Sequence, residues 1–364
     1  MKQAVLLAVF IGIILVACSN GVSTAVEQAA NIDATVSAAV AATRTASDVQ
    51  EKVAATLSAP TPTTAPPTPT TESASTVNKI LDNVLALSEN HVTTGVDYFK
   101  DGRYEDAIQE FDQAIQLDPD FAIAFMDRGL AYYHLGENQT AISDYDKAIQ
   151  LDPNYFKAYL HRGLAYSGLG QYQATIADST MAIQLDPDNG LGYGARGHSY
   201  ANLGQYQDAI ADYTMAIQLD PDNGLGYGAR GHSYANLGQY QDAIADYTMA
   251  IQLDPDDAIA YGNRGHSYVN LGQYQATIAD STMAIQLDPD DGLLDGQSYR
   301  TRGHAYYELG EYQSAVEDLD QAIQIDPNYA WAYAARAAAL WELGQSSLSD
   351  KDSEKACKLD RSHC

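Results

Sequence analysis

The sequence predicts an all-α solenoid of stacked helical hairpins, and two observations carry this prediction. The segment from Thr180 to Asp222 reappears residue for residue as Thr214 to Asp256, a shift of 34 positions, and such a period is typical of a repeated supersecondary unit. Within each unit, apolar and small residues recur every three or four positions in two runs, which is the spacing of helices that bury one face. These units bury their apolar faces only against copies of themselves, so we expect them to stack.

The unit that begins at Gly190 shows where each helix begins and ends. Its first helix is expected to end at Leu203-Gly204, because glycine can adopt the left-handed turn that follows a helix. Its second helix is expected to end at Asp220-Pro221, because proline lacks an N–H group and disfavours helical geometry in the residue before it. Packing is assigned to one stripe on each helix: Tyr193, Gly197 and Tyr200 on the first, and Tyr206, Ala209, Tyr213, Ala216 and Leu219 on the second. We expect Gly197 to face Ala209 and to let the two helix backbones approach closely.

These hairpins resemble tetratricopeptide repeats, whose pattern of an aromatic residue, glycine and tyrosine, then a closing proline, recurs along the chain. The aromatic residue, glycine and tyrosine recur as Phe125-Gly129-Tyr132, Tyr159-Gly163-Tyr166, Tyr227-Gly231-Tyr234, Tyr261-Gly265-Tyr268 and Tyr299-Gly303-Tyr306. The closing prolines are Pro119, Pro153, Pro187, Pro221, Pro255, Pro289 and Pro327. The resemblance covers residues 88–364 and implies a right-handed superhelical solenoid of about eight hairpins. The spacing of 38 between the last two prolines indicates a four-residue insertion around Asp291–Leu294. The degenerate eighth repeat is expected to cap the solenoid.

The first residues predict targeting rather than fold. Residues 1–17 have one charged side chain, Lys2, before an uncharged apolar run, which is typical of a signal peptide. The run ends in Leu15-Val16-Ala17-Cys18, which resembles a bacterial lipobox. That resemblance implies a lipidated Cys18 and a chain anchored by lipid to a membrane of the cell envelope, on its extracytoplasmic side. The alternative is an ordinary signal peptide or membrane anchor with an incidental cysteine.

Three segments are predicted between the lipidated end and the repeats. Residues 18–57 form an Ala-rich spacer, which is either a stalk helix or a flexible chain. Residues 58–75 are a Pro/Thr-rich linker with an extended conformation. Residues 76–87 are predicted to form an apolar capping helix before the repeat domain of residues 88–364.

The net charge of −28 restricts the partners of this chain. The 20 basic residues are dispersed, which excludes a basic surface for nucleic acid. The charge permits a basic or neutral partner, although an acidic solvated face would explain it equally. The sequence contains no catalytic constellation and no metal-ligand cluster. It also contains no cofactor motif: the glycines Gly192, Gly194 and Gly197 have the spacing of a dinucleotide-binding motif, but they lie within a predicted helix and follow no strand. We therefore expect no enzyme activity and no cofactor.

Arginine and aspartate recur at fixed positions in the repeats. In seven repeats an arginine precedes the glycine of the first helix, or the alanine that replaces it in the last repeat, and an acidic residue recurs on the second helix. We expect Arg196 to pair with Asp212 or Asp178, and Arg230 with Asp246 or Asp212, because a lone buried charge is costly. The alternative is that these arginines reach a carboxylate of a ligand.

A second polar set follows the glycines and comprises His198, His232, His266 and His304, with Asn202, Asn236 and Asn270 one helical turn later. Leu191, Gly194, His198 and Asn202 form one stripe, and the family resemblance implies that this face lines a concave groove that binds an extended peptide or a partner helix. We expect these histidines and asparagines to hydrogen-bond the partner's backbone, or else to be tolerated polar residues. The sequence thus favours a lipid-anchored scaffold or adaptor for protein partners. The rival function is a small-ligand or metal-binding protein that uses the histidines.

Two further expectations concern stability. If Cys18 is lipidated, Cys357 and Cys364 remain, and they form either a disulfide that holds the last helix or two free thiols. Thr175 with Ser179, and Thr277 with Ser281, replace the alanine and tyrosine of the second helix. These positions are predicted to be the weakest joints of the array.

Overall fold

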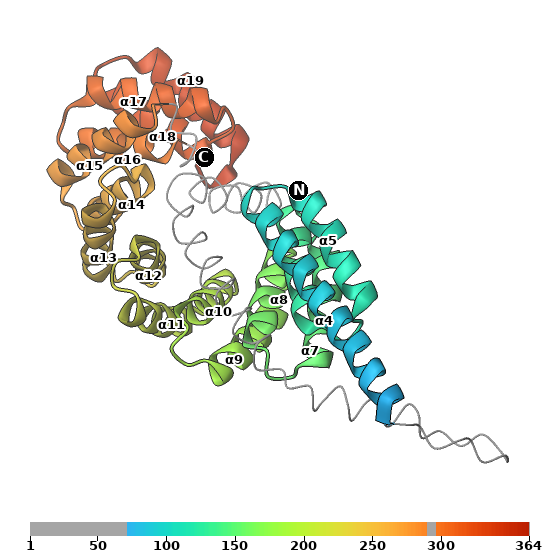
Figure 1. The fold of residues 1–364 in the computed structure, drawn as a ribbon. Coiled ribbons are helices and arrows are strands. Elements are labelled where there is room, and N and C mark those ends of the chain that lie inside the picture. The colour runs from blue at the N-terminus through green and yellow to red at the C-terminus, as the bar shows by residue number, and fades with distance from the viewer. Residues whose placement is uncertain (1–70, 290–295, 364) are drawn as a thin grey trace. The chain divides into compact units, whose positions relative to one another are not determined.

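The computed structural model describes residues 71–289 and 296–363 of the chain (Figure 1). Over these residues the chain forms sixteen α-helices and one short 3-10 helix, with no strand, and consecutive helices pair into hairpins. The prediction of an all-α repeat fold with about eight hairpins is confirmed. The signal peptide, Cys18, the spacer, residues 58–70 of the linker and the insertion at 291–294 lie outside the described residues. Residues 71–75, predicted as the end of the extended linker, belong instead to the first described helix, Thr71–Lys100.

The helices belong to two compact units that meet in sequence between Asp186 and Pro187. The N-terminal unit contains three hairpins: α4 (Thr71–Lys100) with α5 (Tyr104–Leu117), α6 (Ala122–His134) with α7 (Asn138–Leu151), and α8 (Phe156–Gly168) with α9 (Tyr172–Leu185). The C-terminal unit contains five: α10 (Gly190–Asn202) with α11 (Tyr206–Leu219), α12 (Gly224–Asn236) with α13 (Tyr240–Leu253), α14 (Ala258–Asn270) with α15 (Tyr274–Leu287), α16 (Gln297–Glu308) with α17 (Tyr312–Ile325), and α18 (Ala330–Glu342) with α19 (Ser346–Leu359).

The helix ends lie where the local sequence sets them. Gly204 follows α10 with φ of 75°, the left-handed conformation that glycine adopts without steric cost. Asp220 follows α11 with a non-helical backbone (φ −137°, ψ 85°), as expected for the residue before Pro221. At the other end, the side chain of Asn189 accepts hydrogen bonds from the first backbone N–H groups of α10 and caps that helix.

The packing inside a hairpin includes partners beyond those that the sequence predicts. A Cβ built on Gly197 would lie 3.1 Å from Cε1 of Tyr213 and 3.2 Å from Cβ of Asp212, so this glycine faces those side chains. In an equivalent hairpin the hydroxyl of Thr175, at the position of Ala209, donates to the carbonyl of Gly163, so that position also faces the glycine. Tyr213 is buried, whereas Tyr193 and Tyr200 are only half-buried. Tyr227 and Tyr261, which are equivalent to Tyr193, pack against buried core residues, so the tyrosines of this stripe lie at the edge of the core.

The N-terminal unit begins with a helix twice as long as the others. The helix predicted at residues 76–87 is not a separate element, because α4 runs without interruption from Thr71 to Lys100 and also provides the first helix of the first repeat. Its C-terminal part packs on α5 through Val92 and Phe111, which are both buried. Leu87 is exposed.

The two helices with Thr and Ser substitutions, α9 and α15, bury both substituted side chains fully. The hydroxyl of Thr175 donates to the carbonyl oxygen of Gly163 at 3.0 Å, so part of the polarity introduced on α9 is satisfied. The buried hydroxyls of Ser179 and Ser281 have no hydrogen-bond partner. A buried hydroxyl without a hydrogen-bond partner is costly, and serine also lacks the ring with which tyrosine fills this position in other repeats. Both effects support the prediction that these joints are weak.

Candidate partner-binding face

The candidate site lies on the first helices of the C-terminal unit. The helices α10, α12, α14, α16 and α18 contact one another in this order. In Figure 1 they lie on the inner side of the curved stack that this unit forms, and α11, α13 and α15 lie on its outer side. We call the repeated surface on α10, α12 and α14 the histidine face; it comprises Leu191, Gly194, His198, Asn202, Leu225, Gly228, His232, Asn236, Ile259, Gly262, His266 and Asn270.

The histidine face combines exposed apolar side chains with open space. Leu191 and Leu225 are 56% and 60% exposed, among the highest values for large hydrophobic residues in the described chain. A Cβ built on Gly194 or Gly228 would meet no atom within 4 Å, so the surface beside these glycines is open. Gly262 is buried, so the third repeat departs from this pattern. The stripe predicted from the spacing is therefore a surface on α10 and α12.

The asparagines of the histidine face bond within their own helix. The side-chain amide of Asn202 donates to the backbone carbonyl of His198 at 2.9 Å and lies 3.0 Å from Nε2 of the same histidine. The amide of Asn270 makes the same two contacts with His266, and that of Asn236 donates to the carbonyl of His232. These amides hold the last turn of each helix, and their oxygens remain as acceptors for a partner.

Burial disfavours the charged form of the histidine rings on this face. Burial lowers the pKa of His198 and His232, although His232 keeps more contact with solvent. The pKa of His266 is also lowered, by burial first and then by the positive charge of Arg300 and by His232. A neutral imidazole offers one donor and one acceptor, which suits a peptide backbone.

His304 has different neighbours from the other three histidines. Its Nε2 lies 3.4 Å from Oε1 of Glu308, and its ring meets Trp331 edge-on at a centroid distance of 5.7 Å. Glu308 stands where the earlier repeats have asparagine. His198, His232 and His266 thus share an asparagine neighbour one turn later, whereas His304 has an aromatic and an acidic neighbour.

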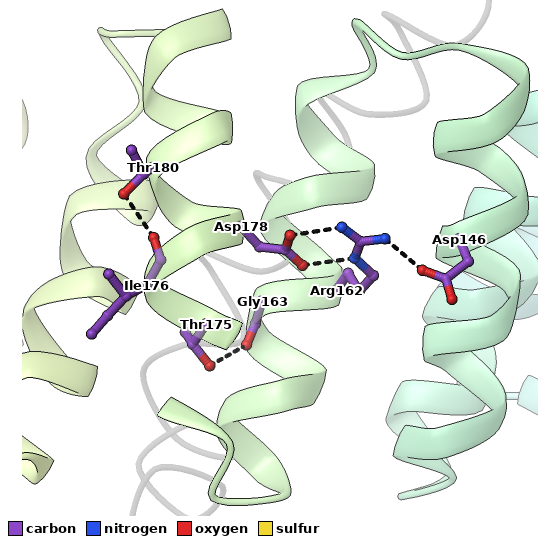
Figure 2. A network of polar contacts seen from close by, with 7 residues as sticks. All are labelled: Asp146, Arg162, Gly163, Thr175, Ile176, Asp178 and Thr180. Carbon is purple, nitrogen blue, oxygen red and sulfur yellow. Dashed lines mark hydrogen bonds and ion pairs between the residues drawn. The ribbon is translucent and has the colours of Figure 1, made fainter. Parts of the chain in front are cut away.

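In both units, the repeated arginine of each first helix forms a two-bond pair with an aspartate of its own hairpin. Figure 2 shows the pattern at Arg162, whose Nε and Nη2 both donate to Asp178 at 2.7 Å. The same two bonds join Arg196 to Asp212 and Arg230 to Asp246, so the structure uses the first of the two partners that the sequence offered. All seven such pairs are Arg128–Asp144, Arg162–Asp178, Arg196–Asp212, Arg230–Asp246, Arg264–Asp280, Arg302–Asp318 and Arg336–Asp352.

The third donor of these arginines links neighbouring hairpins, a contact that the sequence prediction missed. Nη1 of Arg162 reaches Asp146 of the preceding hairpin (Figure 2), and Nη1 of Arg230 donates to the hydroxyl of Thr214 at 3.0 Å. The partner lies 16 positions before the arginine in both cases. Asp112, Asp146 and Asp320 fill this position beside Arg128, Arg162 and Arg336, and Thr214 and Thr248 fill it beside Arg230 and Arg264. Thr282 makes the same contact with Arg302 from 20 positions before it, since four extra residues lie between these two repeats. The sequence signal that could have predicted this contact is the recurrence of Asp or Thr at that position of the preceding hairpin.

The described residues give no support to a metal site. Within residues 71–289 and 296–363, no three His, Cys, Asp or Glu side chains gather closely enough to hold a metal ion. None of the helices in the same ranges has the length and apolar character needed to span a membrane. Cys357 is disulfide-bonded, but Cys364 lies outside the described residues, so their pairing stays a prediction.

Comparison with known sequence families identifies the repeat. The family described as "TPR repeat" matches residues 231–272 and 303–344, and families described as "Tetratricopeptide repeat" match residues 92–156, 144–177, 191–223, 213–245 and 258–291. No curated protein sequence matches the chain.

Solved structures share the fold at low identity. The Cut9–Hcn1 hetero-tetramer of APC/C matches with a TM-score of 0.52 and 18% identity, over 78% of this chain and 56% of that one. A tetratricopeptide repeat protein from Parabacteroides merdae matches with a TM-score of 0.50 and 17% identity, over 70% of this chain and 99% of that one. YrrB, described as a TPR protein with an unusual peptide-binding site, is 24% identical with a TM-score of 0.45, over 50% of this chain and 94% of that one. The hairpins of both units are tetratricopeptide repeats.

Proposed function

We propose that this protein is an interaction scaffold whose histidine face binds an extended peptide segment or a helix of a partner protein. The observation that carries the proposal is the repetition of one surface on adjacent helices. On α10 and α12, an exposed leucine, an open glycine, a neutral histidine and an exposed asparagine follow one another along the helix. A surface repeated along a solenoid offers successive equivalent contacts to one extended chain.

The spacing of these contacts fits a peptide. Packed helices lie about 8–10 Å apart, and an extended chain advances about 3.3 Å per residue, so equivalent groups on adjacent helices meet every third residue. Leu191 and Leu225 would contact apolar side chains of the partner. The open surface beside Gly194 and Gly228 would admit its larger groups. The neutral histidines would then exchange hydrogen bonds with the partner's backbone.

We propose further that Cys18 anchors the scaffold by lipid to the extracytoplasmic side of an envelope membrane. This part rests on the sequence from Leu15 to Cys18 after an uncharged apolar run. Replacing Cys18 by Ser is expected to leave an unprocessed or unlipidated chain, visible as a changed mass in the processed protein and as loss from the membrane fraction. Unchanged mass, processing and membrane retention would contradict the anchor.

Binding by the histidine face is tested with a partner captured from membrane extract on the chain from Ser19 to Cys364. The triple variant His198→Ala, His232→Ala, His266→Ala is expected to bind that partner at least about tenfold more weakly at pH 7.5, because several hydrogen bonds are lost together. The matched control is Gln218→Ala, Gln252→Ala, Gln286→Ala, which changes three exposed side chains of α11, α13 and α15.

The control variant should bind like the parent. The parent's affinity should also change only at acidic pH, because burial lowers the pKa of all three histidines. Equal affinity of the histidine variant and the control would show that the partner binds elsewhere.

A further inference from the structure

The last hairpin of the C-terminal unit contains a cavity that the histidine face does not include. It has a volume of about 340 Å³ and lies among α16, α18 and α19. Its walls include Tyr307, Trp341 and Glu342, and small residues such as Ala334, Ala338 and Ser353 complete the lining. This volume is near the lower end for ligand sites, so it suits one large side chain better than a whole small molecule.

The cavity arises because the last repeat lacks a ring. In the hairpin of α10 and α11, the ring of Tyr213 lies against Gly197 and is buried. The equivalent positions of α18 and α19 hold Ala337 and Ser353. The space that tyrosine occupies in a regular repeat is therefore not filled by the chain at this end.

The aromatic walls of the cavity favour a flat group that can stack on a ring. Trp341 is 62% exposed, the highest value among the exposed large hydrophobic residues of the described chain. The ring of Tyr307 packs against that of Tyr312 at a centroid distance of 5.6 Å, which fixes one wall. Aromatic faces carry negative charge density, so they attract a cation that lies over them.

The polar end of the cavity is acidic. The carboxylate of Glu308 is engaged, since it lies 3.4 Å from both Nε2 of His304 and the hydroxyl of Tyr274. Glu342 forms no hydrogen bond or ion pair with any described residue. Burial raises the pKa of Tyr307, and the nearby Glu342, Tyr312 and Glu308 raise it further.

We propose that this cavity binds an arginine side chain of the partner, with the guanidinium stacked on Trp341 and paired with Glu342. The proposal rests on the peptide-binding function proposed above and adds the chemistry of one anchor residue. Arginine fits better than lysine because its planar fork both stacks on an indole and pairs with a carboxylate through two bonds. The net charge of −28 favours the approach of a basic segment and opposes an acidic one.

The two tryptophans of the protein give a direct signal for this site. Trp331 and Trp341 are its only tryptophans and both lie on α18. The probe is a blocked peptide, acetyl-Gly-Gly-Arg-Gly-Gly-amide, titrated into the full chain while tryptophan emission is recorded. The comparison peptide has citrulline in place of arginine, which keeps the shape and removes the charge. We expect saturable binding of the arginine peptide and about tenfold weaker binding of the citrulline peptide.

Two variants and a control locate the binding. Glu342→Gln should weaken the arginine peptide about tenfold and leave the citrulline peptide nearly unchanged. Ala338→Leu should fill the cavity and remove binding of both peptides. Glu317→Gln removes the same charge from an exposed position of α17 and should bind like the parent. Glu342 is exposed, so its variant is expected to fold and provides the test even if Ala338→Leu does not.

The outcomes separate this inference from the proposed function. Equal affinity for the arginine and citrulline peptides, or no effect of Glu342→Gln, overturns the arginine site. If a captured partner still depends on the three histidines in that case, the scaffold function stands without this anchor. Binding of the arginine peptide by the triple histidine variant is expected to match the parent, because its changes lie on α10, α12 and α14.

Discussion

At the scale of single residues, the N-terminal unit contains three buried polar atoms without a hydrogen-bond partner besides the hydroxyl of Ser179. They are Oδ2 of Asp127, the hydroxyl of Tyr145 and Nδ1 of His161. Asp127 and His161 occupy equivalent positions of α6 and α8, where α10 and α12 have alanine. Burial raises the pKa of Asp127 to about 7 and lowers that of His161 to about 4, so the unit favours the neutral form of both groups.

Asp127→Asn is expected to stabilise the protein at high pH. The folded pKa of Asp127 lies above its unfolded value, so the free energy of unfolding of the parent falls as pH rises from about 4 to about 7. The variant lacks this loss and should be up to about 4 kcal/mol more stable than the parent at pH 8, and similar to it at pH 4. Thermal melts between pH 4 and pH 8 give the comparison. Asp101→Asn, at an exposed turn, is the control; parallel curves for parent and Asp127→Asn would contradict the prediction.

The arginine pairs make a second prediction at this scale. Arg230 bonds to Asp246 and to Thr214, whereas Asp212 bonds to Arg196. Arg230→Ala and Asp246→Ala should therefore be non-additive in stability by about 1–3 kcal/mol, because each single change leaves the other charge without its partner. Arg230→Ala combined with Asp212→Ala should be nearly additive. Denaturant melts of the single and double variants measure both couplings, and equal coupling in the two cycles would rule out the assigned pairing.

At the scale of one helix, α12 contains two glycines with opposite surroundings. A Cβ on Gly228 would meet nothing within 4 Å, whereas a Cβ on Gly231 would lie 3.1 Å from the ring of Tyr247 and 3.2 Å from Asp246. The same residue type thus serves an open surface at one position and close helix packing at the other.

We predict opposite signs for alanine at these two glycines. Gly228→Ala should stabilise the protein by about 0.5–1 kcal/mol, because alanine is the better helix former. Gly231→Ala should destabilise it by about 1–3 kcal/mol, because the methyl group overpacks against Tyr247. Thermal and urea melts of the two variants provide the measurement, and each serves as the control for the other. A stabilising effect at Gly231 would mean that the hairpin relaxes at no cost.

At the scale of the whole molecule, the acidic charge opposes folding. The chain has 48 acidic and 20 basic residues, and its arginines are mostly used within the hairpins. The remaining carboxylates on the surface repel one another, and salt screens this repulsion over about 10 Å at 0.1 M.

Salt is therefore expected to stabilise this protein. Raising NaCl from about 0.02 to about 0.5 M should raise the melting temperature by a few degrees, since the Debye length shortens severalfold. A variant with Asp188→Asn, Asp222→Asn and Asp256→Asn should melt higher in low salt and respond less to added salt, because it lacks three exposed charges. Calorimetry of both proteins is the check, and a melting temperature that falls with salt would refute the role given to repulsion.

The sequence by itself determined the repeat, the two helices of each hairpin and the residues at which they end. These features depend on local chemistry: the left-handed turn at Gly204, the restriction before Pro221, and the apolar spacing along one helix. Within one hairpin, the sequence also offered the pairing of Arg230 with Asp246, because a fixed period places the two side chains at the same level in every repeat.

Only the tertiary structure decided which groups meet between helices. The bond from Arg230 to Thr214, the ring of Tyr213 against Gly197 and the cavity beside Trp341 all depend on how far one helix is displaced along its neighbour. If one helix is displaced along its neighbour by one residue, different side chains come into contact. The residue spacing along a single helix does not determine this displacement. The intrahelical bond of Asn202 was missed for a different reason: its side chain could satisfy its own helix or a partner equally well, and the folded geometry selects the helix.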